Sequence, residues 1–302
     1  SSRSKAYFYL LVAVAIWGFA GPIIKFTLGT FDPLVFLTYR FFLTCLVLIP
    51  VLFISEPRSF QTLTHLSPHD WLILVVSGLL GTAGQLLLLF YGFSLTSSID
   101  GTLISSTSPI LVAFAGAILL HERVTRREKI GMTIAFAGTL IIVSQTFFES
   151  GQLFSGTSLG NLLVMAGNFC WVANVIMGKK LLRHHLSPLL QTTISFFLGF
   201  LAVSLILFTT KPTYLVYQQL TTNNLQPHMG VIYMALLSGA LAYYLYRKAQ
   251  KSIETSEADT FVYLQPLFGT PLAYFWLKEP ITLPFIIGAI IIAIGVFLVE
   301  RK

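Results

Sequence analysis

Charged residues are scarce in this chain. Only 10% of its 302 residues are Asp, Glu, Lys or Arg, whereas a soluble domain carries roughly 25%. Hydrophobic residues make up 55% of the sequence, and the mean hydropathy is +0.79. A soluble protein could not cover its surface with so little charge, so the composition favours a lipid environment. The two cysteines, Cys45 and Cys170, both fall in apolar runs, which argues against a disulfide framework and indicates buried free thiols.

Motifs of soluble catalysis are also missing. The sequence has no HExxH, no GxGxxG and no Walker-type loop, so nothing supports an ATPase, a metalloprotease or a nucleotide-driven pump. We therefore expect no enzyme activity, no cofactor and no metal. The net charge of +7 is typical of nucleic-acid binding, but the basic residues lie in short connectors between apolar runs. Nucleic acid is accordingly excluded as a partner.

Long apolar runs dominate what is present. A helix needs roughly 20 apolar residues to cross the hydrocarbon, and ten such stretches can be placed along the chain. They lie near residues 7–28, 33–54, 69–93, 98–119, 125–146, 158–179, 187–208, 229–250, 255–277 and 281–300. The sequence thus predicts an all-α integral membrane protein with ten transmembrane helices.

Basic residues predict the orientation of these spans. The termini and the even-numbered connectors carry 15 Lys and Arg, the opposite side carries three (Lys25, Lys211 and Lys278), and Arg40 lies inside a span. Because Lys and Arg accumulate on the cytoplasmic side, both termini are predicted to be cytoplasmic. The count of 15 includes Arg247, Lys248 and Lys251, which are assigned to the connector between the eighth and ninth spans.

The two halves of the chain repeat. Pro109, Glu122, Gly131 and Gly138 precede Pro266, Glu279, Gly288 and Gly295 by the same 157 residues. Each copy holds five spans, and because five is odd the second copy must be inverted, as in many transporters. We expect a first repeat at 1–147, a second repeat at 156–302 and an external linker at 148–155.

The order and spacing of several short motifs resemble the drug/metabolite transporter superfamily of the EamA type. The matching residues are Ala15-Ile16-Trp17-Gly18 with Lys25, Tyr39-Arg40, Ser108-Pro109, His121-Glu122-Arg123, Gln265-Pro266 and Lys278-Glu279-Pro280. The resemblance covers the whole chain and implies two EamA repeats around a central cavity. It also implies transport of small molecules, with amino acids or related metabolites as the expected substrates, across the bacterial inner membrane. Membrane lipid is the other expected partner. The protein is expected to be a monomer.

Aromatic residues and prolines gather near the middle of the predicted spans. Trp17 and Trp171 are unusual there, because Trp prefers the membrane interface and its N–H needs an acceptor. Pro109 and Pro266 are predicted kinks, either hinges beside the site or static bends. With Tyr39, Tyr243, Tyr244 and Tyr263, the two tryptophans are expected to line a cavity, although core packing is the alternative.

Polar side chains inside spans complete the predicted site. Arg40 is expected to bind a substrate carboxylate or phosphate, or else to snorkel outward or clamp helix-end carbonyls. Gln85, Asn174 and Gln265 are cavity contacts or bonds between helices. Glu122 and Glu279 are expected to hold the turns at the ends of two spans. Thr125 and Glu128 form a capping-box pattern.

Acidic residues are absent from the middle of every predicted span. All twelve lie in connectors or near span ends, and all six histidines lie in connectors. Proton-coupled carriers need a titratable group in the path, so this pattern favours facilitated diffusion or exchange, with Asp100 and Asp259 as the remaining candidates. A secondary transporter or facilitative exporter working by alternating access is therefore the main hypothesis. A lipid or lipid-linked-sugar flippase, using Lys25 and Arg40, is the alternative.

Overall fold

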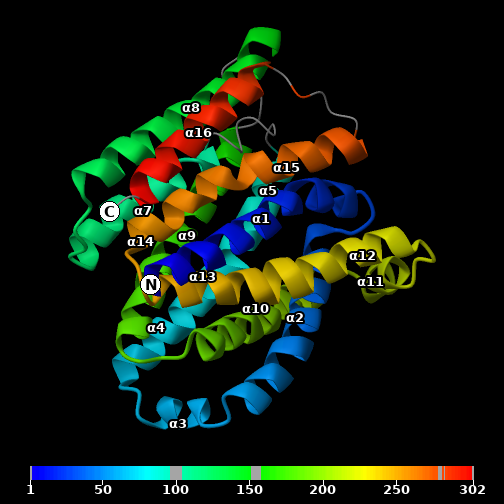
Figure 1. Cartoon of the computed structure of the whole chain (residues 1–302). Helices are drawn as coiled ribbons and strands as arrows, with labels where there is room; N and C mark the ends of the chain where they lie inside the picture. Colours follow the sequence, from blue (N-terminus) through cyan, green and yellow to red (C-terminus); the bar gives the residue numbers. More distant parts are fainter. Residues whose placement is uncertain (1, 96–103, 151–157, 278–280, 282, 301–302) are drawn as a thin grey trace.

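The computed structural model describes residues 2–95, 104–150, 158–277, 281 and 283–300, and within these residues every regular element is helical (Figure 1). The first half contains α1 (Ser2–Leu28), α2 (Pro33–Ser55), α3 (Ser59–Thr64), α4 (Pro68–Leu79), η1 (Leu80–Gly84), α5 (Gln85–Leu95), α7 (Ser108–Leu119) and α8 (Arg126–Ser150). The second half contains α9 (Ser158–Arg183), α10 (Pro188–Thr210), α11 (Thr213–Leu220), α12 (Leu225–Tyr233), η2 (Met234–Leu241), α13 (Ala242–Gln250), α14 (Thr255–Thr260), η3 (Phe261–Leu264), α15 (Gln265–Leu272), η4 (Ala273–Leu277) and α16 (Leu283–Glu300). The predicted all-α class is confirmed.

Seven helices in the described part of the chain are long and apolar enough to cross a membrane. They are residues 3–28, 33–55, 68–95, 158–183, 188–210, 225–250 and 283–300. Helix is also found in the described parts of the other three predicted spans, as α7, α8 and the α14–η4 segment. The end of α8 at Ser150 overlaps the first residues of the predicted linker at 148–155; residues 151–157 lie outside the described part.

Local sequence signals explain where several helices begin. Asp32, Ser67 and Ser187 each precede a proline, and each side chain accepts a hydrogen bond from a backbone N–H of the first turn of α2, α4 or α10. A capping residue followed by proline is a favourable helix start, since proline has no N–H to leave unpaired. The capping box at the start of α8 is confirmed, because Glu128 N–H donates to Thr125 Oγ1 at 3.2 Å and the Glu128 carboxylate accepts from Thr125 N–H.

Helices α8 and α16 pack against each other along their length (Figure 1). Their glycines meet in pairs: a Cβ on Gly131 would lie 2.6 Å from the carbonyl oxygen of Gly295, and one on Gly138 would lie 2.7 Å from that of Gly288. The glycines that mark the internal repeat thus allow the two helices to approach closely. Small residues matter here because helices in lipid associate through close van der Waals contact.

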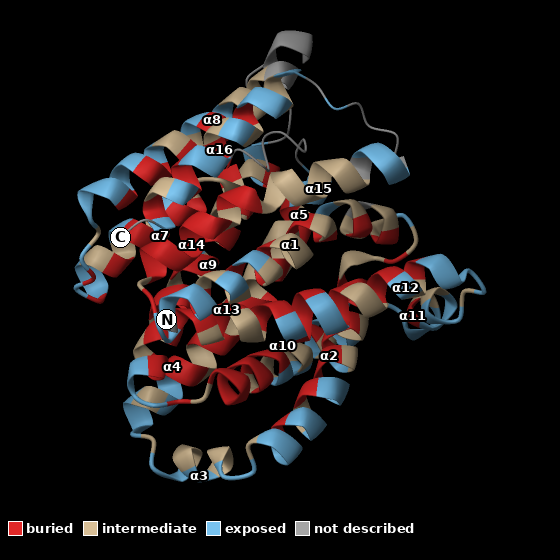
Figure 2. Ribbon diagram, in the orientation of Figure 1, coloured by how far each residue is buried: buried red, intermediate tan, exposed pale blue. Residues whose placement is uncertain are grey.

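Burial divides the helices into an inner and an outer face. Buried residues concentrate in the middle of the bundle and exposed ones on its outer faces (Figure 2). Many exposed residues are large and apolar, including Phe8, Ile54, Phe114 and Leu205, each more than 50% exposed. Such a surface suits hydrocarbon and not water. The chain ends lie together, since Tyr7 Oη donates to the Glu300 carbonyl at 3.3 Å; we call this side of the bundle the terminal end.

The opposite end is tied by an ion pair between the α1–α2 turn and the end of α10. Lys211 Nζ lies 2.6 Å from Asp32 Oδ2, and the hydrogen bond to Asp32 raises the pKa of Lys211. Both side chains are partly exposed, so the pair contributes less than about 1 kcal/mol. We expect Lys211→Gln to lower the unfolding free energy by no more than this, measured by thermal denaturation in detergent.

The effect of Lys211→Gln should depend on pH. A lysine whose pKa is raised by folding stabilises the protein below its ordinary pKa, and that contribution is lost as the pH rises through the raised value. The difference between the native protein and the variant should therefore shrink at strongly alkaline pH and at high salt. A difference that is unchanged by both would contradict an ionic contribution.

Candidate functional site

Aromatic side chains from four helices meet in the middle of the bundle. Ring centroids of Trp17 on α1 lie 5.9 Å from Trp171 on α9, 5.3 Å from Tyr243 on α13 and 5.4 Å from Tyr246. Phe196 on α10 completes the group, 5.1 Å from Tyr243. These separations, mostly with tilted or edge-to-face rings, are the favourable geometry for aromatic pairs. We call these five residues the aromatic cluster.

Both cluster tryptophans have hydrogen-bond acceptors. Trp17 Nε1 donates to the Ser238 carbonyl at 3.1 Å, and Trp171 Nε1 donates to Asp259 Oδ1 at 3.0 Å. The sequence prediction that each indole needs an acceptor is confirmed. The Ser238 carbonyl lies in η2, a π-helical segment. Such segments are frequent at functional sites.

Asp259 is a fully buried carboxylate beside the aromatic cluster. Its Oδ1 accepts from Trp171 and from Tyr246 Oη at 2.8 Å, and its Oδ2 accepts from Ser108 Oγ at 3.4 Å. The expectation that every acidic residue lies in a connector or near a span end holds for the position of Asp259 in the chain. Asp259 lies near the start of its helical segment, but its carboxylate reaches Trp171, which stands at the middle of α9.

Arg40 is also buried, with 1% of its surface exposed. Its Nη2 donates to Ser238 Oγ at a long 3.4 Å, and its Nε has no hydrogen-bond partner. This burial rules out the alternative in which Arg40 snorkels to the surface. Because Trp17 and Arg40 both bond to Ser238, the predicted arginine lies next to the aromatic cluster.

A second buried arginine was missed by the sequence analysis. Arg247 belongs to α13 and is 4% exposed, so assigning it to a cytoplasmic connector was wrong. Its guanidinium donates to Gln250 Oε1 at 2.9 Å and to the Asn174 carbonyl and side-chain oxygens. Asn174 thus bonds across helices, as one of its two predicted roles requires. No carboxylate pairs with either Arg40 or Arg247 among the described residues.

Gln85 and Gln191 add uncharged polar groups near Tyr243 and Arg247. Tyr243 Oη donates to Gln85 Oε1 at 3.4 Å. Gln191 is fully buried, and neither its Oε1 nor its Nε2 has a hydrogen-bond partner. Buried amides without partners are rare in folded proteins. Among the described residues, the interior of the bundle therefore contains amide groups without hydrogen-bond partners and two arginines without a carboxylate partner.

Other predicted site residues lie apart from the aromatic cluster. Tyr39 packs against Phe31 and His228, with ring centroids 6.2 and 5.8 Å away. Tyr244 accepts a hydrogen bond from Lys248 Nζ at 3.1 Å and is half-buried. Tyr263 is buried, and its hydroxyl has no hydrogen-bond partner. Of the four tyrosines predicted to line one cavity, only Tyr243 belongs to the aromatic cluster.

The two predicted kink prolines follow interruptions of the helix. Pro109 lies in the first turn of α7, after turn residues 106–107, and Pro266 lies in the first turn of α15, after the 3₁₀ segment η3. The Gln265 N–H donates to the Val262 carbonyl, which is the carbonyl that Pro266 would otherwise leave unpaired. The backbone of Gln265 also lies against α1, because a Cβ on Gly18 would approach its carbonyl oxygen to 2.6 Å. A hinge role for either proline stays a prediction.

The terminal end is closed by buried carboxylates. Glu122 accepts from Thr255 N–H at 2.8 Å and from Thr255 Oγ1 at 2.6 Å, and Arg183 lies 3.5 Å away. Burial raises the pKa of the Glu122 carboxyl, and the hydrogen bonds from Thr255 oppose that shift. Glu257, fully buried in α14, pairs with Arg3 at 2.8 Å and accepts from Tyr7 Oη. Glu122 thus connects the first half to the start of α14, besides ending its own span.

Glu279 and Asp100 lie outside the described residues, as does the side chain of Lys25.

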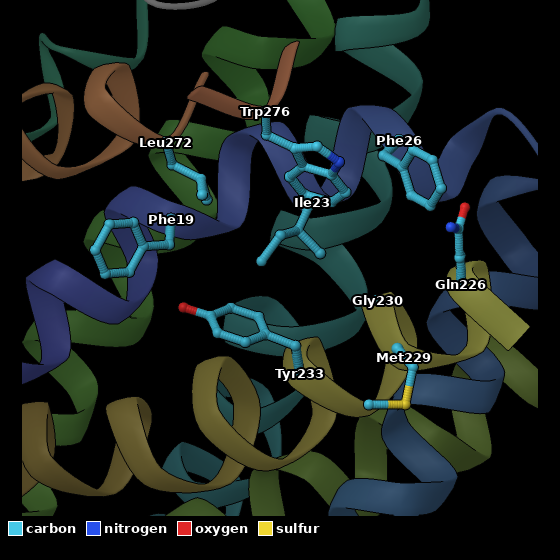
Figure 3. Close-up of a pocket in the computed structure, with 9 residues that line it drawn as sticks. All are labelled: Phe19, Ile23, Phe26, Gln226, Met229, Gly230, Tyr233, Leu272 and Trp276. Carbon is cyan, nitrogen blue, oxygen red and sulfur yellow. The ribbon is translucent and has the colours of Figure 1, made fainter. Parts of the chain in front are cut away.

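A pocket of about 510 Å³ lies between α1, α12 and the α15–η4 segment. Figure 3 shows Phe19 and Ile23 of α1 facing Tyr233 of α12, with Trp276 above them. The full lining is Phe19, Ile23, Phe26, Gln226, Met229, Gly230, Tyr233, Leu272 and Trp276. None of the predicted substrate residues lines it. The lining on α1 begins two residues after Trp17. Tyr233, another lining residue, donates from its Oη to the carbonyl of Ile16, the neighbour of Trp17, at 2.8 Å.

A second pocket, at the terminal end, is basic. It also measures about 510 Å³. Its lining residues are Arg3, Arg123, Thr125, Lys179, Arg183, Lys251, Ser252, Ile253 and Glu254. Lys179 is largely buried there and donates to the Gln250 and Ile253 carbonyls. The terminal end is thus the positively charged end of the bundle.

Apolar helices around buried polar groups define a multi-pass membrane protein. The model of the EamA-like transporter family matches residues 4–144 and 158–301, and the chain belongs to this family. The uncharacterized transporter YyaM of Bacillus subtilis is 29% identical over 96% of this chain and 92% of its own length. A probable amino-acid metabolite efflux pump of Salmonella typhimurium is 25% identical over 98% of this chain and 95% of its own. The family and these names point to transport and not to enzyme activity.

The fold has a solved counterpart. A crystal structure with 16% sequence identity superposes with a TM-score of 0.79, covering 98% of this chain and 96% of the other. At that identity the likeness concerns the fold alone.

Proposed function

We propose that this protein is a secondary transporter that exports amino acids or related small metabolites by alternating access. The observation that carries the proposal is that Arg40, Arg247 and Asp259 are buried beside the aromatic cluster, inside a bundle of largely apolar helices. Charged side chains inside membrane spans are costly to bury and usually serve a transported polar solute. Relatives named probable amino-acid metabolite efflux pumps, from Salmonella typhimurium and Escherichia coli, favour the same class of substrate.

The proposed architecture is ten spans in two inverted repeats. Packing between helices supports it, because exchanging the halves reproduces the pairs: α1 packs on α13 as α9 packs on α5, and α1 packs on α15 as α9 packs on α7. The pairs α2–α10 and α8–α16 each join one helix to its own counterpart. The π-helical segments η1 and η2 also fall in corresponding spans.

The proposed orientation places both termini in the cytoplasm of a bacterial cell. Two features support it: the chain ends lie together, as an even number of crossings requires, and the pocket at that end is basic. Positive charge collects on the cytoplasmic side of membrane proteins. The structure then corresponds to an outward-facing state, with the Glu122 and Glu257 contacts closing the cytoplasmic side and the apolar pocket open to the outside.

The proposed substrate site lies between that pocket and the closed terminal end. Arg40 would bind the carboxylate of the substrate, since its guanidinium is buried with one long hydrogen bond and an unused Nε. Trp17, Trp171 and Tyr243 would hold the apolar part. Tyr233, which lines the pocket and donates to the Ile16 carbonyl next to Trp17, would be the residue that a substrate passes on its way to the cluster.

Transport by the purified protein in liposomes tests this proposal. We expect counterflow of at least one radiolabelled amino acid from a panel of all twenty, above the level of protein-free liposomes. A fluorescent-lipid flip assay on the same preparation serves as the comparison. Lipid movement without amino-acid movement would overturn the proposal and favour a flippase, and no movement of any amino acid by folded protein would exclude this substrate class.

A further inference from the structure

Asp259 is a buried acid for which the proposed transport cycle has no role so far. Its side chain is fully buried, and no Lys, Arg or His lies within ion-pair distance of it in the described part of the chain. The carboxylate is held only by neutral donors: the indole of Trp171 and the hydroxyls of Tyr246 and Ser108. A buried carboxylate without a cation is rare, because burial penalises the charged form.

The two oxygens of this carboxylate have different surroundings. Oδ1 accepts two hydrogen bonds of ordinary length, at 2.8 and 3.0 Å, and is the acceptor in either protonation state. Oδ2 has only the 3.4 Å contact with Ser108 Oγ. A hydroxyl can donate or accept, so a proton on Oδ2 could be donated to Ser108 without moving any heavy atom far. The geometry therefore accommodates both forms of the acid.

The neighbours of Asp259 come from both halves of the chain. Ser108 begins α7 in the first half, whereas Trp171 and Tyr246 belong to α9 and α13 in the second. Adding a proton replaces the charge-assisted hydrogen bonds from Trp171 and Tyr246 by weaker neutral ones. The protonation state of Asp259 therefore changes how strongly α14 is held to α9 and α13 within the second half, while α14 also packs against α7 of the first half, where Ser108 contacts Asp259.

Other titratable groups face the same place. Tyr246 bonds directly to Asp259, and the Asp259 carboxylate acts electrostatically on Tyr263 of η3. Arg247 and Glu122 act on Tyr246 and so stand one step further away. From α1, Tyr7 reaches Glu257, two residues before Asp259. Asp259 alone among these acids is held only by neutral donors, since Glu257 pairs with Arg3 and Glu122 lies near Arg183.

We propose that Asp259 is the proton-carrying carboxylate of a proton/substrate antiport, taking up a proton on the outside and releasing it to the cytoplasm as substrate is exported. The proposal rests on the transport function proposed above. It replaces the expectation of facilitated diffusion or exchange, whose premise was that no acid lies at depth. Ligands shift a two-state protein only through a difference in affinity between its states, and protonation at this contact between the halves supplies one.

Infrared spectroscopy tests the protonation itself and needs no substrate. The purified native protein, titrated across the neutral pH range, should show the carbonyl band of a protonated carboxylic acid that disappears as the pH rises. Asp259→Asn should lack this titrating band, and Asp259→Glu should restore a titrating band at a shifted midpoint. Asp70→Asn, at the first turn of α4, is the matched carboxylate-to-amide control and should leave the band unchanged.

Transport in a pH gradient tests the coupling. For one proton per substrate, a gradient of about one pH unit should drive up to about tenfold accumulation of the amino acid found in the counterflow assay, because both ratios represent the same free energy. Asp259→Asn should lose this accumulation, and any exchange it retains should no longer depend on pH. Asp70→Asn should respond to the gradient like the native protein.

The outcomes separate the two proposals. A titrating band that persists in Asp259→Asn, or gradient-driven accumulation by that variant, overturns the role of Asp259. The same holds if the native protein shows no titrating band or moves substrate without regard to the gradient. Failure of every amino acid to move, with the titrating band present and assigned to Asp259, would overturn the proposed substrate class alone.

Discussion

Replacing Arg40 with glutamine is expected to weaken binding of an amino-acid substrate by about 10- to 100-fold. The guanidinium is buried with one long hydrogen bond to Ser238 Oγ and an unpaired Nε, so a substrate carboxylate would be its main partner. Hydrogen bonds to charged groups contribute roughly 1.5–3 kcal/mol each, which corresponds to that range of affinity. The measurement is the half-saturation concentration for counterflow in liposomes, with Arg40→Lys, which keeps the charge, expected to lie between the native protein and Arg40→Gln.

A substrate analogue separates this role from a structural one. The native protein should discriminate strongly between an amino acid and its amino alcohol, which lacks the carboxylate. Arg40→Gln should lose most of that discrimination, because the group that recognises the carboxylate is gone. If Arg40 only supports the packing of α2 against η2, the variant would melt at a lower temperature and keep the discrimination, and the binding role would be disproved.

Enlarging Gly138 is expected to destabilise the protein more than any surface change. A Cβ at this position would lie 2.7 Å from the Gly288 carbonyl oxygen and 2.8 Å from Ile292. The nearest atom belongs to the backbone of α16, so a valine side chain can be accommodated only if α8 and α16 separate. Overpacking of this kind lowers the unfolding free energy by roughly 1–3 kcal/mol. Thermal denaturation of Gly138→Val in detergent measures the effect.

Gly21 provides the matched control for this substitution. It also lies within a long helix, but a Cβ there would meet nothing within 4 Å. Gly21→Ala should therefore be neutral or stabilising by up to about 1 kcal/mol, because alanine favours helix more than glycine does. Equal melting temperatures for Gly138→Val and the native protein would show that the contact between α8 and α16 is not tight in solution.

Several features of the site were predictable because they depend on local sequence. Trp17, Trp171 and Arg40 stand out as polar or amphipathic side chains inside apolar runs, and the structure brings all three near Ser238 or Asp259. Tyr246 gave no such signal, since it lies one turn beyond Tyr243 in a sequence rich in tyrosine. Tyr39 and Tyr244 are tyrosines inside apolar runs, as Tyr243 is. Their side chains nevertheless contact His228 and Lys248, respectively, and not the aromatic cluster.

The sequence by itself determined the helical class, the positions of the seven apolar spans that the structure bears out, the capping box of α8 and the glycines that let α8 and α16 approach closely. These follow from quantities that act along the chain: the thickness of the hydrocarbon, the hydrogen bonds of a helix end and the small size of glycine. Only the tertiary structure decided that Asp259 and Arg247 are buried. Each lies near the end of an apolar run, where the sequence places a charge at the membrane surface. Their depth depends on the side chains of other helices, Trp171 and Tyr246 for Asp259 and Asn174 for Arg247, and no pattern within one span records those contacts.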